Sequence, residues 1–164
     1  MLRFNSDHKF KIMQIADTQE IPAVSPDTLS LINNALDREK PDLVIFTGDQ
    51  IKGYSKKFKK DPAIIEGTID TLVEPIAKRN IPFMVTYGNH DAQCGVDNRG
   101  QYKFYAKYDN FISGDLRNAD DVGTADIQIY SSTEDKPVFE LYIIDSHGKA
   151  KDGAGYAPVD KKQI

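Results

Sequence analysis

The 164-residue sequence has little of several things that would assign it to a particular class of protein. It contains one cysteine, Cys94, three histidines and no tryptophan. A single cysteine excludes an internal disulfide and is typical of a reducing compartment, so we expect a cytoplasmic protein. We expect the Cys94 side chain to pack as a small buried hydrophobe. No apolar run approaches the roughly 20 residues that a membrane helix needs, and residues 1–11 lack the apolar core of a signal peptide. Association with a membrane is therefore not expected.

Charge of either sign is also not in large excess. The chain has 21 basic and 25 acidic residues, which gives a formal net charge of -4, and we expect no nucleic acid as a stable partner. No Gly-x-Gly-x-x-Gly follows the first expected strand, which disfavours a dinucleotide-binding domain. What the chain does have is an ordinary composition for one soluble globular domain, with 40% hydrophobic and 28% charged residues.

The first half of the sequence alternates short apolar runs with longer amphipathic segments, after a polar lead-in at 1–8 that we expect to be frayed. We predict strands at 10–16, 42–46 and 81–85, and helices at 26–39 and 62–79, the second with a kink at Pro75. This β-α-β-α-β order predicts an α/β fold with a parallel sheet flanked by helices. Beyond it we predict an aromatic-rich helix at 100–111, a hairpin with strands at 126–130 and 137–144, and a helical turn at 159–164.

Polar residues follow each of the three expected strands. Asp17 comes after the first strand, Asp49 after the second and Asn89 after the third. Open α/β sheets carry their chemistry at the carboxyl ends of the strands, so we expect these side chains to converge on a cation. His90, next to Asn89, can move a proton near neutral pH, and Asp91 is expected either to orient the His90 ring or to cap the following segment.

Three blocks carry a resemblance to a known family. Asp17-x-Gln19, Gly48-Asp49-x-x-x-Gly53 and Gly88-Asn89-His90-Asp91 resemble the first three signature blocks of the calcineurin-like metallophosphoesterases, in the branch related to purple acid phosphatases. The resemblance implies a four-layer sandwich of two sheets between helices. Because the later histidine block of the family is absent, we expect residues 1–164 to be a single domain of this kind, incomplete at its C-terminal end.

The resemblance also implies a site with two divalent metal ions, which can be Mn, Fe, Zn or Mg. Asp49 would bridge them, Asp17 and Asn89 would each bind one ion, and His90 would act as general acid or transition-state donor, with Asp91 orienting it. Gln19 replaces the histidine of the usual first block, and its harder oxygen ligand favours Mn. The iron-binding tyrosine of the purple acid phosphatases is replaced by a lysine, Lys52, so no tyrosine-to-iron colour is expected.

The function predicted from this resemblance is metal-dependent hydrolysis of a phosphomonoester or phosphodiester, with a phosphorylated substrate as the partner. The alternative is a catalytically inactive or weakly metal-binding fragment, favoured by Gln19 and by the missing histidines. An incomplete second sheet would leave an apolar face open, which predicts a homo-oligomer. The lysines of segment 56–60 are either solvated surface or an attraction for a phosphorylated substrate. Asp145-Ser146-His147 is not expected to form a serine-hydrolase triad, because no Gly-x-Ser-x-Gly elbow is present.

Overall fold

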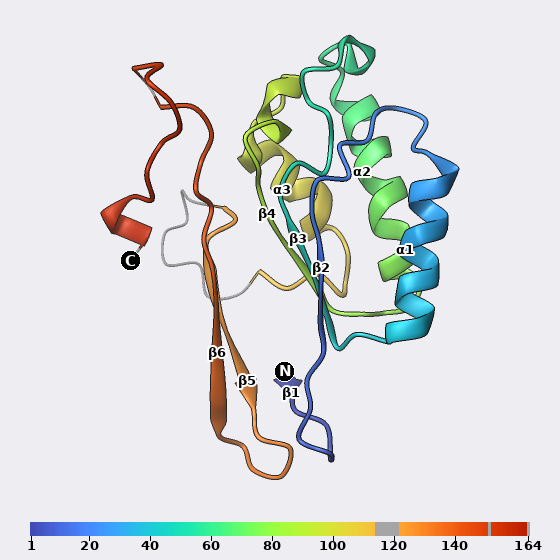
Figure 1. The fold of residues 1–164 in the computed structure, drawn as a ribbon, viewed down its shortest axis with the longest axis vertical. Helices are drawn as coiled ribbons and strands as arrows, with labels where there is room; N and C mark the ends of the chain where they lie inside the picture. The colour runs from blue at the N-terminus through green and yellow to red at the C-terminus, as the bar shows by residue number, and fades with distance from the viewer. Residues whose placement is uncertain (114–121, 151, 164) are drawn as a thin grey trace.

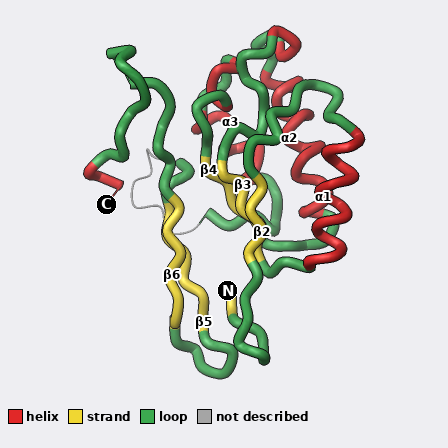
Figure 2. Tube along the Cα trace, in the orientation of Figure 1, coloured by secondary structure: helices red, strands yellow, loops and turns green. Residues whose placement is uncertain are grey.

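The computed structural model describes residues 1–113, 122–150 and 152–163. It has two three-stranded sheets, and the α-helices of the described residues lie on one side of the first sheet (Figures 1 and 2). In chain order the elements are β1 (Leu2–Arg3), β2 (Ile12–Ile15), α1 (Pro26–Glu39), β3 (Leu43–Thr47), η1 (Lys56–Phe58), α2 (Pro62–Ala77), β4 (Phe83–Thr86), η2 (Asp91–Cys94), α3 (Asn98–Ala106), β5 (Ala125–Tyr130), β6 (Pro137–Ile143) and η3 (Lys161–Gln163). Ile164, the last residue of the expected C-terminal turn, lies outside the described residues.

The first sheet has the order β2-β3-β4 and is fully parallel. Helices α1 and α2 make the two crossovers, and each starts with a proline behind a capping side chain. Ser25 accepts a hydrogen bond from the amide of Asp27, and Asp61 accepts one from the amide of Ala63. The parallel α/β architecture predicted from the sequence is confirmed. Its consequence is that β2, β3 and β4 all end at the same edge of the sheet.

Two apolar cores hold the layers together. One face of the first sheet packs on the helices through a cluster that includes Phe46 and Phe83, both fully buried. The other face packs on the second sheet through a cluster that includes Leu43, Ile45 and Ile129. Strand β3 is buried along Leu43–Phe46 because it faces a core on both sides, which explains its uninterrupted apolar sequence. The result is a layer of helices, a parallel sheet and a second sheet.

The second sheet has the order β1-β5-β6 and corrects one expectation. Leu2 and Arg3 are not part of a frayed lead-in, because they form a short strand parallel to β5, with Leu2 opposite Ile129. β5 and β6 form the expected antiparallel hairpin, and its turn is closed by a hydrogen bond of 2.9 Å from the amide of Ser131 to the carbonyl of Lys136. Strand β1 was not predicted because two residues are too few to show a periodicity.

Two helices differ from their expected extents. α3 begins at Asn98 and ends at Ala106, five residues before the predicted end at 111, and Asp97 caps it by accepting from the amide of Gly100. Its aromatic residues still pack on the core, as predicted, with Tyr105 2% exposed. α2 continues through Pro75 to Ala77. Within the residues that the structure describes, no helix combines the length and the apolar character needed to cross a membrane.

Candidate metal and phosphate site

The loops that follow β2 and β3 run side by side at the carboxyl edge of the first sheet. The amide of Asp17 donates to the carbonyl of Gly48 at 3.0 Å, and the amide of Gln19 donates to the carbonyl of Asp49 at 2.9 Å. The pairing extends beyond the strands to an isolated parallel bridge between Glu20 and Ile51. The segments that carry three predicted metal ligands, Asp17, Gln19 and Asp49, are therefore held together by their backbones.

The loops that follow β3 and β4 approach so closely that glycine is required on both. A Cβ atom on Gly48, whose φ is +109°, would lie 2.5 Å from the amide nitrogen of Gly88. A Cβ on Gly88 would lie 2.1 Å from Oδ1 of Asp49. The amide of His90 donates to the same Oδ1 at 2.8 Å. One oxygen of Asp49 is thus fixed by the Asn89–His90 loop, whereas Oδ2 has no hydrogen-bond partner in the described part of the chain.

The backbone at three predicted ligands adopts the left-handed conformation. The φ angles are +52° at Asp17, +44° at Gln19 and +51° at Asp49. Residues other than glycine rarely adopt this conformation, which costs about 1–3 kcal/mol and persists where the surrounding structure enforces it. Here the hydrogen bonds between the two loops enforce it. Strained positions of this kind are common at functional sites.

Asp91 does not orient the ring of His90, which corrects the predicted role. Its carboxylate is fully buried and accepts three backbone hydrogen bonds, from the amides of Asp49 and Gly88 at 2.8 Å each and from the amide of Ile51 at 3.2 Å. Burial raises the pKa of Asp91 to about 6, against the lowering effect of these amides. Asp91 therefore acts as a buried junction between the loop after β3 and the loop after β4.

A buried glutamine that the sequence did not single out completes this junction. Gln50 is 1% exposed. In the amide orientation that satisfies both of its ends, its nitrogen donates to the two Asp91 oxygens at 3.0 and 3.2 Å, and its oxygen accepts from the amide of Gly48 at 2.8 Å. Its position directly after the Gly48-Asp49 block is the only sequence feature that could have pointed to it.

The ring of His90 is held by residues other than Asp91. Its Nδ1 lies 3.1 Å from Oε1 of Gln93, whose Nε2 donates to the backbone carbonyl of Asn89 at 3.1 Å. The ring of Tyr54 meets the His90 ring edge-on, with 4.8 Å between the ring centroids. Gln93 and Tyr54 thus position the imidazole, and neither was predicted from the sequence. Gln93 could have been suspected from its place three residues after His90, one helical turn away.

His147 lies at the border of this region rather than among the predicted ligands. Its Nε2 lies 3.0 Å from Oε1 of Gln163, and its amide donates to the carboxylate of Asp145 at 2.8 Å. The following residue, Gly148, approaches Asn89, because a Cβ on it would lie 3.9 Å from the Asn89 Cα. Asp145 contacts the backbone of His147 in this way, which is not the geometry of a hydrolase triad.

The donor set determines which metal the site could hold. Among the residues that the structure describes, no three His, Cys, Asp or Glu side chains come close enough to hold a metal ion. The four predicted ligands at the carboxyl edge are all oxygen donors, the carboxylates of Asp17 and Asp49 and the carboxamides of Gln19 and Asn89. This set suits one oxygen-preferring ion such as Mn²⁺ or Mg²⁺. The described residues do not assemble the further ligands that a second ion would need.

Comparisons with known proteins agree with this arrangement. The profile of a family described as calcineurin-like phosphoesterase matches residues 10–160. Among curated proteins, "Probable inactive purple acid phosphatase 14" of Arabidopsis thaliana is 28% identical over 94% of this chain and 44% of its own length. "Phosphatase DCR2" of Saccharomyces cerevisiae is 31% identical over 97% of this chain and 30% of its own length.

A shorter match reaches a bacterial protein. An "Uncharacterized metallophosphoesterase" of Aquifex aeolicus is 28% identical over 54% of this chain and 31% of its own length. The chain thus spans less than half the length of each of these three relatives. The matched region of the family profile nevertheless includes all three signature blocks, the whole first sheet, and β5 and β6 of the second. The chain belongs to the calcineurin-like phosphoesterase family, whose members generally use divalent metal ions.

Proposed function

We propose that this chain binds a divalent cation, with Mn²⁺ favoured, at the edge formed by Asp17, Asp49 and Asn89, and hydrolyses a phosphomonoester or phosphodiester there. The observation that carries the proposal is the interlocking of the loops after β2, β3 and β4, in which His90 donates its amide to the Asp49 carboxylate. This interlocking places His90, a residue whose side chain can move a proton near neutral pH, next to an acidic ligand in the fold, which supports phosphoester hydrolysis.

Each residue has a distinct part in this proposal. Asp17 and Asp49 supply the negative charge that attracts the cation, and the carboxamides of Gln19 and Asn89 add neutral oxygen ligands. His90 delivers a proton to the leaving oxygen or donates a hydrogen bond to the phosphate, while Gln93 and Tyr54 hold its ring. A bound divalent ion supplies the positive charge that neutralises the phosphate and makes an attacking water more acidic.

Metal binding and turnover can be tested separately. We expect Mn²⁺ titration in a calorimeter to give saturable binding that weakens at least about tenfold in Asp49→Asn, because the variant loses a charged ligand. With millimolar Mn²⁺, the wild type should release nitrophenolate from p-nitrophenyl phosphate or its bis ester, and His90→Ala should lower the rate by about 10²-fold or more. Asp109→Asn, which changes an exposed carboxylate without a partner in the described residues, is the control.

The second candidate is a domain that binds a metal without turnover. It is favoured because no three His, Cys, Asp or Glu side chains are grouped to hold a metal ion within the described residues, and by the word "inactive" in the name of the first relative. Binding of Mn²⁺ without hydrolysis of either ester would select this second candidate. An absence of both binding and turnover would overturn both candidates.

A further inference from the structure

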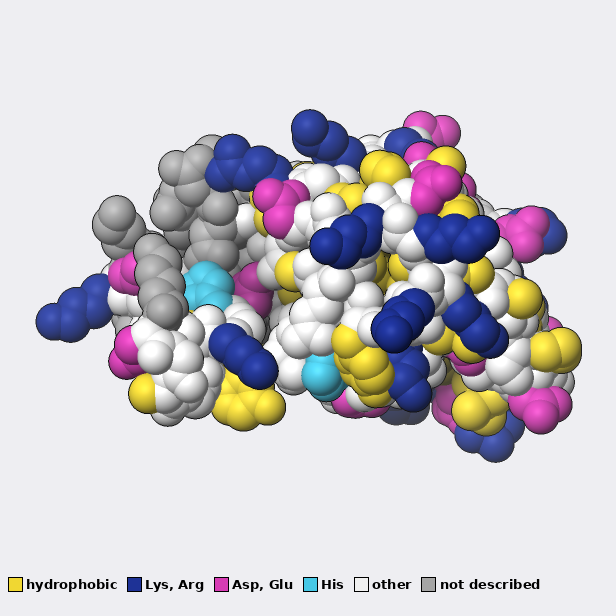
Figure 3. All heavy atoms as spheres, turned by 90° about the horizontal axis from the view of Figure 1, so that it is seen from above, with side chains coloured by type: hydrophobic (Ala, Val, Ile, Leu, Met, Phe, Trp, Pro, Cys, Tyr) yellow, Lys and Arg dark blue, Asp and Glu magenta, His cyan; other side chains and the backbone are white. Residues whose placement is uncertain are grey.

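A group of lysines borders the candidate site and makes no ion pairs in the described part of the chain. The segment from Lys52 to Lys60 contains five lysines and no acidic residue, in a chain whose net charge is negative. None of the five makes an ion pair in the described part of the chain, whereas Lys9, Lys11, Lys78 and Lys107 each have an acidic partner. Viewed from above, Lys and Arg side chains gather on this end of the molecule, with a histidine at their border (Figure 3).

The lysine segment is anchored to the body of the protein. Phe58, in the middle of the segment, is 1% exposed and belongs to the core beneath α2. Gly53, at its start, lies against the backbone of the His90 loop so closely that a Cβ would be 2.0 Å from the His90 carbonyl oxygen. Lys59 and Lys60 both have left-handed backbones, with φ of +53° and +54°. The positions of these lysines are therefore fixed by packing and by backbone conformation.

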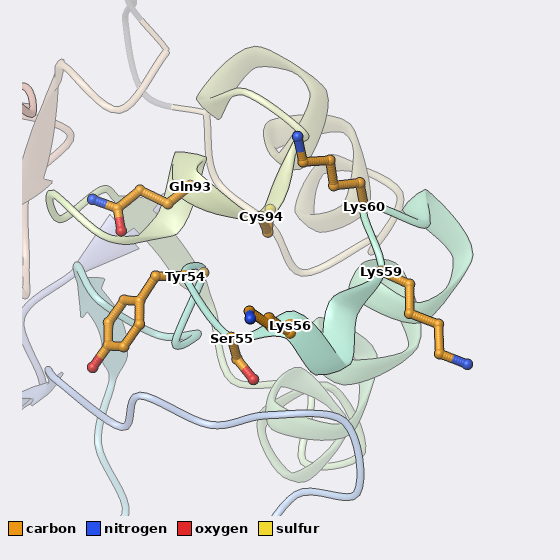
Figure 4. Close-up of a pocket in the computed structure, with 8 residues that line it drawn as sticks. Tyr54, Ser55, Lys56, Lys59, Lys60, Gln93 and Cys94 are labelled. Atoms are coloured by element: carbon orange, nitrogen blue, oxygen red, sulfur yellow. The ribbon is translucent and has the colours of Figure 1, made fainter.

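The segment and η2 enclose a pocket of about 270 Å³. Its walls include Tyr54, Ser55, Lys56, Lys60, Gln93 and Cys94 (Figure 4). In this view Lys56 lies between Ser55 and Cys94, whereas Lys59 extends outward. The aliphatic stem of Lys60 passes over Gly95, where an added Cβ would lie 3.0 Å from Cβ and Cγ of Lys60. A glycine at this position, with φ of +100°, leaves room for the stem.

The pocket shares a wall with the candidate site. Tyr54 and Gln93, which line the pocket, both contact the His90 ring. The pocket also has the chemistry that a phosphate group needs, because Lys56 and Lys60 are cations without an ion-pair partner among the described residues and Ser55 carries a hydroxyl. Burial raises the pKa of the Cys94 thiol, so the pocket floor carries no negative charge that would repel an anion.

We propose that this pocket binds a second phosphate group of the substrate, while the phosphate to be cleaved lies at the Asp17–Asp49–Asn89 edge. The inference rests on the proposed hydrolase function and narrows its substrate class to small molecules with two phosphates. The two lysines, Lys56 and Lys60, and the hydroxyl of Ser55 match a dianionic group, and the neighbouring His90 places the two phosphate positions next to each other.

The test compares two sugars that differ by one phosphate, fructose 6-phosphate and fructose 1,6-bisphosphate, with phosphate release measured in the presence of Mn²⁺. We expect the wild type to have a KM about tenfold lower for the bisphosphate, and Lys56→Gln/Lys60→Gln to remove this preference without changing kcat for the monophosphate. Lys57→Gln, a change of the same kind on the same segment but outside the pocket lining, should keep the preference. An equal ratio of KM values in the wild type and the double variant would overturn the proposal.

A second measurement separates the pocket from catalysis. Fructose 1,6-bisphosphate is titrated into the protein by calorimetry in metal-free, low-salt buffer, with folding of each variant checked by circular dichroism. We expect binding to the wild type and to Lys57→Gln, at least about tenfold weaker binding to the double variant, and weakening of all three by salt. If the wild type hydrolyses neither sugar but shows this pattern, the hydrolase function fails and the pocket remains. If it does not bind the bisphosphate, the pocket proposal fails whatever the activity.

Discussion

Asp91 is the residue on which the geometry of the candidate site depends most. Its two oxygens accept hydrogen bonds from three backbone amides and from Gln50, and no water reaches them, since the residue is fully buried. Asp91→Asn keeps the shape but replaces one acceptor with an NH₂ group that would face amide donors. We expect it to lower the free energy of unfolding by about 2–4 kcal/mol at neutral pH, measured by urea denaturation.

The pH dependence of the stability difference between the wild type and Asp91→Asn tests whether the buried carboxyl group causes that difference. The pKa of Asp91 is raised from 3.8 to about 6 in the folded protein, so the folded state binds a proton more tightly than the unfolded chain. The stability that this proton contributes is complete below pH 3.8 and is lost as the pH rises through 6. The wild type should therefore gain up to about 3 kcal/mol over Asp91→Asn as the pH falls from 7 to 4. A constant difference over this range would contradict the assignment, and Asp109→Asn should stay within about 0.5 kcal/mol of the wild type throughout.

The roles of single residues were the hardest to predict from the sequence. Asp91 follows His90 directly, which suggested that it orients the ring, but it is turned into the protein toward amides more than 35 residues earlier in the chain. Such a partner depends on how the loops pack and leaves no local pattern. Gln93 was missed for the opposite reason, because a glutamine in a short helical turn is an ordinary surface residue unless its neighbour is known. Cys94 was predicted as a small buried residue and is 2% exposed.

Among elements, the contact between the loop after β3 and the loop after β4 should be the least tolerant of added atoms. A Cβ on Gly53 would meet two backbone oxygens, at 2.0 Å on His90 and at 2.9 Å on Asp91. Neither oxygen can move as the end of a flexible side chain would. We expect Gly53→Ala to lower the free energy of unfolding by about 1–3 kcal/mol or more, and to lower activity by displacing His90.

The matched control is Gly67→Ala in the middle of α2. Apart from its chain neighbours and the adjacent helix backbone, a Cβ there would meet no atom within 4 Å, so the same substitution only removes the flexibility of glycine from a helix. We expect it to raise the free energy of unfolding by about 0.5–1 kcal/mol. Chemical denaturation of both variants should show a lower free energy of unfolding for Gly53→Ala and a higher one for Gly67→Ala. Equal changes in the free energy of unfolding would show that the loops after β3 and β4 move apart easily, contrary to the packing described above.

Elements were predictable where the sequence carried both a period and a boundary residue. α1 was predicted at its observed limits, because Pro26 follows the capping Ser25 and Pro41 follows its end. The end of α3 was predicted five residues late, because aromatic residues continue to Phe111 and pack on the core after the helix has stopped. A continuing apolar pattern shows that a segment is buried and does not show that it is helical.

At the scale of the whole molecule, the family resemblance supplied what the pattern alone could not. Alternating strands and helices predict a parallel sheet, but they do not predict that a hairpin beginning only at Ala125 covers its second face. That packing joins Leu43 and Ile45 of β3 to Ile127 and Ile129 of β5. The same arrangement leaves the outer side of the second sheet without a helix in the described part of the chain. Val138 and Tyr142, two residues of β6 on that side, are 55% and 52% exposed.

β6 is also the last strand in the order β1-β5-β6, so one of its edges has no strand partner among the described residues. A free edge beside exposed apolar side chains favours pairing between copies of a chain, in line with the homo-oligomer expected from the sequence. We therefore expect the protein to self-associate with rising concentration in sedimentation velocity experiments. Val138→Lys should weaken this association by about tenfold, because a charge at a strand edge opposes pairing.

Leu31→Lys provides the matched comparison for this experiment. Leu31 is 70% exposed on α1, where the backbone is already hydrogen-bonded within the helix and offers no edge for pairing. If association depends on the β6 edge, Leu31→Lys should leave it unchanged while Val138→Lys weakens it. Equal weakening by both would indicate a general effect of added charge. A wild type that sediments as a monomer at every concentration would show that exposed residues such as Val138 and Tyr142 are tolerated without a second copy.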